Sequence, residues 1–283
     1  MREIKTRPTC GLFHQSPTER DNTEASILSE TTYNLYALCQ GSRVCDASWL
    51  LYLSESGRTR TLPYFFWVLM PEDGGKPIVV DTGFSEESQK KRNPDYADYR
   101  PQHELLKNFD LKPSEVETMI VSHLHWDHFA SPRLFTGARF YLQKRELDFW
   151  RSDAAEYHFI NHFLGDLEEA EKLLEAGRME LVDGEAEIAD GVRVHWTGGH
   201  TPGHQIIRFR SARGWAVLAV DAAYLYRSLE SMIPPGIHIH VDDALRALET
   251  VKDLADAPDL IFAGHDETDL RREEVYPGVR RFV

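Results

Sequence analysis

Short apolar runs rich in aromatic and β-branched residues recur along the chain from Tyr33 onward, and most are too short to be helices. Such runs between turn residues are typical of buried strands. They predict strands at residues 33–39, 48–54, 64–70, 77–80, 118–122, 140–142, 179–182, 192–196, 205–209, 215–220 and 260–263. The sequence Glu72-Asp73-Gly74-Gly75 between two of these runs predicts a hairpin turn.

Helical periodicity is clearest in the second half of the chain. Residues 154–176 carry an apolar stripe that includes Phe159 and Phe163, and residues 242–254 are amphipathic, so each segment predicts a helix. A third, short helix is predicted at 103–109. The Phe159/Phe163 stripe is expected to pack in the core rather than to form an acyl-chain groove. Because no linker divides the chain, we expect one α/β domain with strands stacked as layers between helices.

The first residues differ in texture from the rest. Residues 1–30 are mostly polar with scattered apolar positions, so they predict an arm or cap, with plain disorder as the alternative. The folded domain is then expected at 31–283. The arm is a candidate for covering a pocket or for contacts between two copies in a homodimer.

Composition and charge restrict the partners. The 283 residues include 32 Lys+Arg and 46 Asp+Glu, which gives a formal net charge of −14. This balance argues against nucleic acid and against an anionic membrane surface, and it leaves a small neutral substrate open. The longest apolar stretch, at 62–70, contains a proline and falls well short of the roughly 20 residues that span a membrane.

The cysteines and the N-terminal sequence indicate the compartment. Cys10, Cys39 and Cys45 are an odd number in a long chain and show no Cys-x-x-Cys spacing, so reduced thiols are expected. The first ten residues are not followed by an apolar core of the kind that a signal peptide has. A cytoplasmic location is therefore the prediction.

The densest cluster of potential metal ligands is His123-Leu124-His125-Trp126-Asp127-His128, directly after the predicted strand at 118–122. Imidazole and carboxylate groups are ligands that divalent transition metals prefer. In a loop, this spacing can turn His123 and His125 to one side and Asp127 and His128 to the other. The cluster therefore predicts a site that can hold two metal ions, with a loop that is merely rich in histidine as the alternative.

Three further candidates follow predicted strands. His200 lies in a Gly-His-Thr-Pro-Gly-His turn after the strand at 192–196, Asp221 follows the strand at 215–220, and His265 follows the strand at 260–263. Loops at strand ends are where a rigid scaffold displays functional groups. Together with the first cluster they make seven ligands, which is enough for two metal sites with a bridging position left for water.

These motifs, in this order, resemble the metallo-β-lactamase superfamily, and the Asp81-Thr82-Gly83 sequence after a strand fits the same family. The resemblance covers roughly residues 33–270 and implies a single-domain αββα sandwich. Closer features are similar to N-acyl homoserine lactonases. These are Leu62-Pro63 before an aromatic strand, Gly203-His204-Gln205, and Asp221-Ala222-Ala223-Tyr224, in which Tyr224 stands where those enzymes carry a tyrosine that contacts the substrate.

The resemblance implies a role for each ligand. His123, His125 and His200 would bind one metal ion, Asp127, His128 and His265 would bind a second, and Asp221 would bridge both. Two divalent ions per chain are implied, with zinc expected first and iron, manganese or cobalt as alternatives. Asp81 is expected to orient a ligand histidine, with a turn-forming role as the alternative.

The implied reaction is hydrolysis of a small-molecule substrate. A divalent metal lowers the pKa of bound water to about 7, so a bridging hydroxide can attack a carbonyl carbon. Tyr224 would stabilise the developing oxyanion, and Asp127 would return a proton to the leaving oxygen. An ordinary buried aromatic is the alternative for Tyr224. The expected function is opening of a lactone ring, foremost in N-acyl homoserine lactones, and the alternative is hydrolysis of another small lactone, an amide or a thioester.

Other classes of protein fit less well. A non-catalytic metal-binding protein is expected to lack one or more ligands, whereas all seven are present. A nuclease is disfavoured by the absence of a basic run, and a β-lactamase by the absence of a secretion signal. Glyoxalase II shares the turn around His200, but the Asp221-x-x-Tyr224 sequence argues against it.

A few residues depart from the lactonase pattern or stay ambiguous. Phe129 stands where the superfamily commonly has a small residue, so it is expected to reshape the rim of the site. His204 is expected to support the turn that holds His200. His238 and His240 alternate across 237–241 and are expected to share one face of a strand, which lies either on the pocket wall or on the surface.

Overall fold

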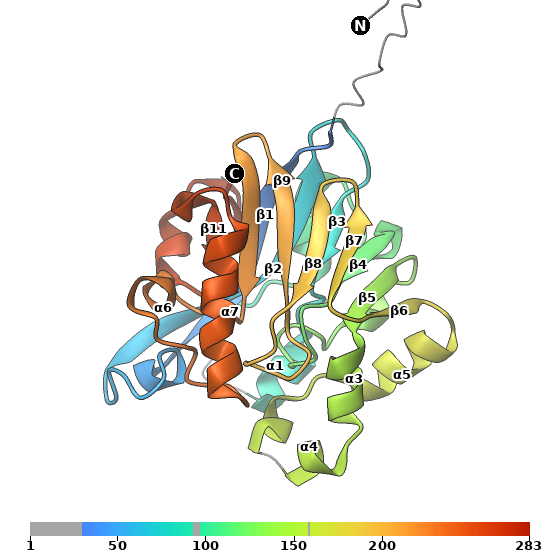
Figure 1. Ribbon diagram of the computed structural model, residues 1–283. Helices are drawn as coiled ribbons and strands as arrows, with labels where there is room; N and C mark the ends of the chain where they lie inside the picture. Colours follow the sequence, from blue (N-terminus) through green and yellow to red (C-terminus); the bar gives the residue numbers. More distant parts are fainter. Residues whose placement is uncertain (1–29, 93–96, 158) are drawn as a thin grey trace, which may run out of the picture.

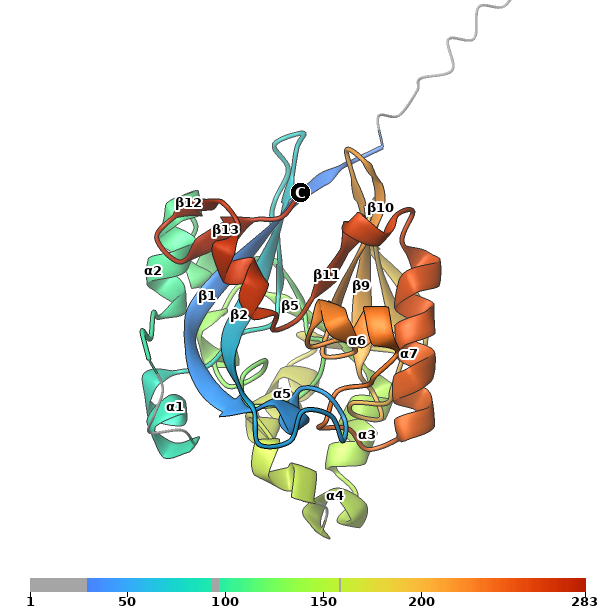
Figure 2. The same ribbon diagram turned by 90° about the vertical axis from the view of Figure 1, so that its left-hand side faces the viewer.

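Two β-sheets packed face to face form the centre of the molecule, and helices cover their outer faces (Figures 1 and 2). The computed structural model describes residues 30–92, 97–157 and 159–283. The eight-stranded sheet, in the order β12-β13-β1-β2-β3-β4-β5-β6, consists of β1 (Tyr33–Asp46), β2 (Thr59–Pro71), β3 (Ile78–Val80), β4 (Thr118–Ile120), β5 (Arg139–Gln143), β6 (Met179–Val182), β12 (Glu274–Tyr276) and β13 (Val279–Arg281). The five-stranded sheet, in the order β11-β10-β9-β8-β7, consists of β7 (Glu185–Ala189), β8 (Val192–Trp196), β9 (Gln205–Ser211), β10 (Gly214–Val220) and β11 (Ile261–Ala263).

The helices are short except for the one that covers the five-stranded sheet. They are α1 (Glu86–Arg92), α2 (Gln102–Leu106), α3 (Lys144–Trp150), α4 (Asp153–Tyr157), α5 (Leu167–Glu175), α6 (Tyr226–Ser231) and α7 (Val241–Leu254). Figure 2 shows α6 and α7 outside the five-stranded sheet and α2 outside the eight-stranded sheet. No helix in the described ranges is long and apolar enough to cross a bilayer.

The alternation of side chains along β2 explains the layers. Phe65 and Trp67 point between the sheets, where they join a buried cluster with Phe209 of β9. Phe66 and Val68, one position along, join a second cluster under the helices. Successive side chains of a strand point to opposite faces, so a strand that is apolar at every position is covered on both sides. The predicted single-domain αββα sandwich is confirmed.

The strands that precede the candidate ligands end at the same edge of the two sheets. The strand β4 pairs in parallel with both β3 and β5, and β10 pairs in parallel with β11. The carboxyl ends of parallel strands meet at one edge, where open α/β sheets bind their ligands. The loops after β3, β4, β8, β10 and β11 are therefore brought together at the lower end of the molecule in Figure 1.

Two of the elements predicted from the apolar pattern are wrong. Residues 48–54 form a 3₁₀ turn and bends rather than a strand, because the Asp46 carboxylate caps the turn by accepting from the backbone of Ser48 and also accepts from Gly57. The single helix expected at 154–176 is divided into α4, the 3₁₀ segment Phe159–Phe163, and α5. The break falls at Gly165, where a Cβ would lie 2.3 Å from the carbonyl oxygen of Phe129.

Several elements have no counterpart among the predictions, namely α1, α3, α6, β7, β12 and β13. The predicted hairpin at 72–75 does join the antiparallel strands β2 and β3.

The proposed arm at 1–30 lies outside the described residues apart from residue 30, and so does Cys10. Cys39 and Cys45 are buried free thiols, as expected.

Candidate metal centre

All seven predicted ligands converge where the strand ends meet. Their ligand atoms form two groups, and within each group the atoms lie within 4.8 Å of one another. One group comprises His123, His125, His200 and Asp221, and the other comprises Asp127, His128 and His265. Six of the seven side chains are buried, and Asp127 is the one that is partly exposed. Residues more than a hundred positions apart in the sequence thus form one centre.

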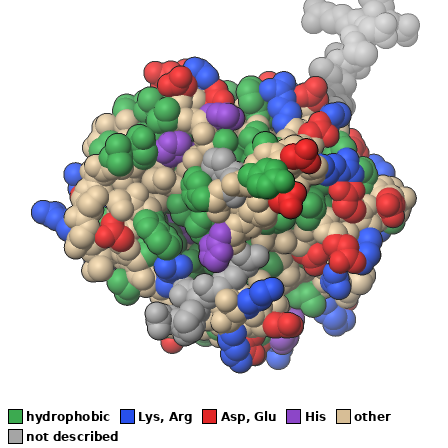
Figure 3. Space-filling view, turned by 90° about the horizontal axis from the view of Figure 1, so that it is seen from below, with side chains coloured by type: hydrophobic (Ala, Val, Ile, Leu, Met, Phe, Trp, Pro, Cys, Tyr) green, Lys and Arg blue, Asp and Glu red, His purple; other side chains and the backbone are tan. Residues whose placement is uncertain are grey.

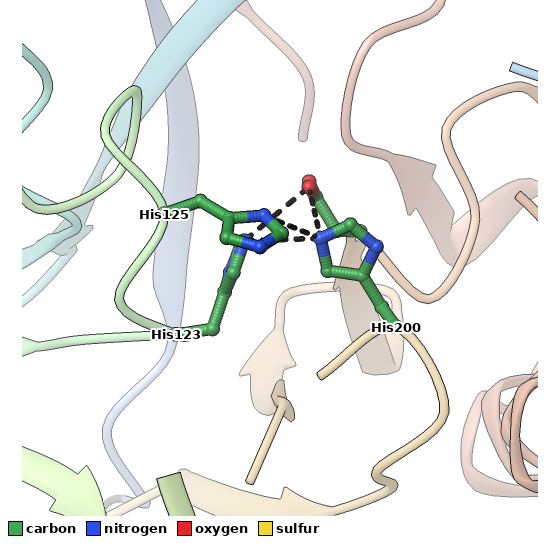
Figure 4. A group of neighbouring side chains, drawn as sticks. His123, His125 and His200 are labelled. Atoms are coloured by element: carbon green, nitrogen blue, oxygen red, sulfur yellow. Dashed lines mark hydrogen bonds and ion pairs between the residues drawn. The ribbon is translucent and has the colours of Figure 1, made fainter. Parts of the chain in front are cut away.

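The first group closes around a single point (Figure 4). His200 Nε2 lies 3.1 Å from His123 Nε2 and 2.9 Å from His125 Nδ1. Asp221 Oδ2 lies 3.1 Å from His200 Nε2 and 3.5 Å from His123 Nε2. Three imidazole nitrogens and a carboxylate oxygen therefore face one another at distances that suit ligands of a common ion.

The second group shares the same aspartate through its other oxygen. Asp221 Oδ1 lies 2.9 Å from His265 Nε2 and 3.3 Å from His128 Nε2. Asp127 Oδ2 lies 3.4 Å from His128 Nε2 and 3.9 Å from His265 Nε2. The two oxygens of Asp221 thus face one group each, which is the arrangement of a bridging carboxylate.

The outer nitrogens of His200 and His265 are held by carbonyl acceptors, which leaves their inner nitrogens free to bind a cation, whereas the outer Nε2 of His125 is buried without a hydrogen-bond partner. Nδ1 of His200 donates to the carbonyl of Ile237 at 2.7 Å, and Nδ1 of His265 donates to the carbonyl of Pro63 at 2.8 Å. Such outer bonds select the tautomer whose Nε2 carries a lone pair. Nε2 of His128 is buried without a hydrogen-bond partner. Converging lone pairs repel one another unless a cation lies between them, so the residues present fit divalent metal ions.

The pKa shifts of His123 and Asp221 favour the forms that bind metal, whereas for His128 and His265 burial lowers the pKa but the neighbouring carboxylates outweigh burial and raise the pKa above its usual value. Burial lowers the pKa of His123 well below its usual value, and neighbouring His128 and His125 lower it further. Burial alone would raise the pKa of Asp221, but the surrounding histidines outweigh it and lower that pKa well below its usual value. A neutral imidazole and an ionised carboxylate are the forms that bind metal.

Asp81 and Ser122 support the centre from beneath. Asp81 Oδ2 lies 2.7 Å from His128 Nδ1, and the same carboxylate accepts from the backbone and the hydroxyl of Ser122 at 2.7 and 2.8 Å. The Ser122 hydroxyl also lies 3.0 Å from His123 Nδ1. The geometry is that expected for Asp81 as an orienting residue, and it identifies His128 as the histidine concerned.

The backbone is strained directly before Asp221 and at Asp81. Val220, directly before Asp221, has φ of 46°, and Asp81 has φ of 64°. A β-branched residue in the left-handed region is an outlier that costs about 1–3 kcal/mol and persists where the surrounding structure enforces it. The Val220 carbonyl lies close against Gly264, at which a Cβ would lie 2.4 Å from the carbonyl oxygen, so this turn requires glycine there.

Glu146 of α3 joins two of the ligand-bearing loops. One oxygen accepts from the backbone of Leu124 at 2.9 Å and from the Trp150 indole at 2.8 Å. The other accepts from the Thr201 hydroxyl at 2.7 Å and from the backbone of Gly203 at 3.0 Å. Leu124 lies between His123 and His125, and Thr201 follows His200. This buried carboxylate therefore fixes one loop relative to the other.

A pocket opens beside the second group of ligands. Its walls are formed by Arg43, Trp49, Leu50, Leu62, Tyr64, His125, Trp126, Asp127, Phe163, Tyr224, Ile237 and His265. Figure 3 views this end of the molecule, where hydrophobic side chains and histidines gather around a hollow. Tyr224 is 6% exposed, and its ring centroid lies 5.1 Å from that of His265. Burial, with Asp221 and Asp127 nearby, raises the pKa of Tyr224 well above its usual value, so its hydroxyl keeps its proton.

Some expectations about neighbouring residues hold and others do not. His204 is buried, and its Nε2 accepts from the backbone of Asp221 at 3.2 Å, so it supports Asp221 as well as its own turn. Phe129 does not reach the rim, because it packs into the core against Phe140. Phe163 was expected in the core but lines the pocket, whereas Phe159 is 61% exposed.

The region of His238 and His240 is not a strand, because 232–240 is irregular and α7 begins at Val241. His238 bonds to the carbonyl of Pro235, and neither histidine lines the pocket. Sequence reasoning also missed Arg43, Tyr64 and Glu146. A signal existed for Glu146, because it stands four residues before Trp150 on the apolar side of a short helix.

Comparisons with known proteins agree with this geometry. The sequence profile of the metallo-beta-lactamase superfamily matches residues 61–265. An N-acyl homoserine lactonase of Bacillus cereus is 27% identical over 265 residues, which cover 87% of this chain and 98% of the relative. Another, of Azorhizobium caulinodans, is 24% identical over 259 residues, covering 83% of this chain and 94% of the relative.

Solved structures of N-acyl homoserine lactonases also match this chain. An N-acyl homoserine lactone hydrolase with the product N-hexanoyl-L-homoserine bound at its catalytic metal centre superimposes with a TM-score of 0.70 at 25% identity. The match covers 87% of this chain and 98% of that structure. A quorum-quenching N-acyl homoserine lactone lactonase matches with a TM-score of 0.69 at 26% identity and the same coverage.

Proposed function

Because the chain belongs to the metallo-beta-lactamase superfamily and is a metal-dependent hydrolase, we propose that it holds two divalent metal ions and opens the ring of N-acyl homoserine lactones. The observation that carries this proposal is the pair of ligand groups joined by Asp221, with the Tyr224 hydroxyl in the adjoining pocket. The lactonase relatives supply the choice of a lactone among carbonyl substrates.

In this proposal each ligand has one place. His123, His125 and His200 hold the first ion, Asp127, His128 and His265 hold the second, and Asp221 contacts both. We propose zinc, because nitrogen ligands from several histidines with carboxylate oxygens suit it well. When bound, such ions supply a water whose pKa is lowered to about 7 and polarise a carbonyl group.

The chain's own residues then orient the lactone and move the proton. The Tyr224 hydroxyl donates to the carbonyl oxygen as negative charge develops on it, which its raised pKa permits. Asp127 is the ligand that is partly exposed to the pocket, so its carboxylate takes the proton that the attacking water gives up and passes it to the ring oxygen when the acyl carbon–oxygen bond breaks. Leu50, Leu62 and Ile237 form an apolar wall that excludes bulk water.

A panel of lactones, amides and thioesters tests this proposal with purified protein reconstituted with zinc. Ring opening of a lactone releases a proton at neutral pH, so a pH indicator reports turnover directly. We expect hydrolysis of at least one N-acyl homoserine lactone. Efficient cleavage of an amide or a thioester with no opening of any homoserine lactone would favour the broader hydrolase function instead.

A further inference from the structure

Arg43 stands on the pocket wall and takes no part in holding the metal ligands. It lies on β1 opposite Leu62 of β2, and both side chains line the pocket that contains Asp127 and Tyr224. Its positive charge reaches Tyr64, where it acts against the burial that raises the pKa of that phenol. The ring centroid of Tyr64 lies 5.8 Å from that of the ligand His265. One aromatic ring therefore separates the guanidinium from the metal centre.

The guanidinium of Arg43 donates to the Tyr64 hydroxyl, but it has no carboxylate partner among the described residues. Its Nε is buried without a hydrogen-bond partner, and its Cζ lies 5.0 Å from the ring centroid of Trp49. Within residues 30–92, 97–157 and 159–283, no ion pair joins Arg43 to a carboxylate, whereas Arg60 pairs with Glu55. The carboxylate of Asp46, close by in sequence, is occupied by Ser48 and Gly57.

A buried donor on a charged group is costly when no acceptor reaches it, so this position favours a ligand that brings one. Stacking on Trp49 fixes the plane of the guanidinium, and its donors then point in set directions. The pocket's other polar side chains, among them Asp127, Tyr224 and His265, belong to the reacting end. The acceptor that the unpaired Nε of Arg43 still needs can therefore come from a second oxygen of the substrate, away from the carbonyl that is attacked.

We propose that Arg43 is a specificity-determining residue that donates to the acyl-amide oxygen of an N-acyl homoserine lactone. This inference rests on the proposed function, because that substrate class carries an amide next to its lactone ring. An alkyl γ-lactone has the same ring and scissile ester but no amide oxygen. Arg43 would thus make the enzyme prefer amide-bearing lactones over alkyl lactones of similar size.

The test compares two substrates and three variants of the zinc-loaded enzyme. N-hexanoyl-homoserine lactone and γ-decalactone are assayed with wild type, Arg43→Met and Arg43→Lys. Arg58→Met is the matched control, because Arg58 is exposed in the connection between β1 and β2 and does not line the pocket. Metal content and the circular dichroism spectrum of each variant show whether the centre and the fold are intact.

For Arg43→Met we expect kcat/KM on the homoserine lactone to fall roughly 10–100-fold, the scale of one charge-assisted hydrogen bond, and to fall through KM rather than kcat. The alkyl lactone should change by less than about threefold, since it makes no such bond. Arg43→Lys should recover part of the loss, and Arg58→Met should behave as wild type.

Two outcomes would overturn this role for Arg43 while leaving the proposed function intact. One is an equal loss on both lactones with metal content unchanged, and the other is no loss on the homoserine lactone. A wild-type enzyme that opens both lactones equally well would also refute it. If the wild type opens neither lactone, the proposed function itself fails, and the role of Arg43 fails with it.

Discussion

Replacing Glu146 by glutamine should weaken the connection between the two ligand loops. The carboxylate accepts four hydrogen bonds, two at each oxygen, from groups that are all buried. An amide has one acceptor oxygen and one donor NH₂ group. Its NH₂ group must therefore face two groups that are themselves donors. The best orientation turns the NH₂ toward Thr201, whose hydroxyl can rotate to accept, and leaves the backbone N–H of Gly203 unpaired.

The magnitude follows from this count. One hydrogen bond to a charged group contributes about 1.5–3 kcal/mol, and the remaining bonds weaken when the acceptor loses its charge. Burial raises the pKa of Glu146 while its four donors lower it, so part of the loss is offset by removing a buried charge. We therefore expect the free energy of unfolding of the metal-free protein to fall by about 2–4 kcal/mol. Zinc affinity should fall roughly 10–100-fold, as for other groups that support metal ligands.

Urea unfolding after chelation measures the first quantity, and competition for zinc with a chromophoric chelator measures the second. Glu180→Gln is the control, because Glu180 lies on the surface in an ion pair with Arg139, and such pairs contribute about 0–1 kcal/mol. A change below about 0.5 kcal/mol for Glu146→Gln, with zinc affinity unaltered, would refute the argument that this carboxylate holds the loops together.

Three further predictions concern the pocket, the strained turn and a remote acid. Tyr224→Phe should keep its metal and lose roughly 10–1000-fold in kcat, and unchanged turnover in a steady-state assay would reduce Tyr224 to packing. Gly264→Ala should cost about 1–3 kcal/mol in urea unfolding and reduce bound metal, because its Cβ would meet the carbonyl of Val220; normal metal content by elemental analysis would contradict this. Burial raises the pKa of Asp269 from 3.8 to about 6, so its contribution to stability is complete below pH about 4 and is lost as the pH rises through about 6, by at most about 3 kcal/mol. Unfolding free energies of wild type minus Asp269→Asn should therefore decrease between pH 4 and pH 7, and a constant difference would exclude this titration.

The fold was predictable where local sequence and burial agree. The apolar runs at β2, β8, β9 and β10 are long or regular enough to specify strands, and the order of the ligand motifs identified the family. The prediction of a strand at 48–54 is wrong because hydrogen bonding to the Asp46 side chain, rather than the apolar pattern, decides the path of the backbone there. The prediction of one helix at 154–176 is wrong because a tertiary contact at Gly165 interrupts a regular helical periodicity of apolar residues.

The convergence of the seven candidate ligands was predictable because metal chemistry restricts residue types and spacing, whereas the residues of the pocket were not predictable. Tyr64 lies on a strand whose apolar pattern indicates only a core, and Arg43 lies beyond residue 39, where the predicted strand ended although β1 continues to Asp46. Phe163 lines the pocket rather than the core because the helix expected at 154–176 is interrupted. The cytoplasmic location, the homodimer and the arm at 1–30 remain predictions.

A zinc titration of metal-free protein, followed by ring opening of N-hexanoyl-homoserine lactone, tests the central claim most directly. Activity should be absent without metal and should rise to a plateau at two ions per chain. Asp221→Ala should bind less metal and remain inactive, because both groups share that carboxylate. Full activity after exhaustive chelation, or no ring opening in protein shown to hold two zinc ions, would contradict the account.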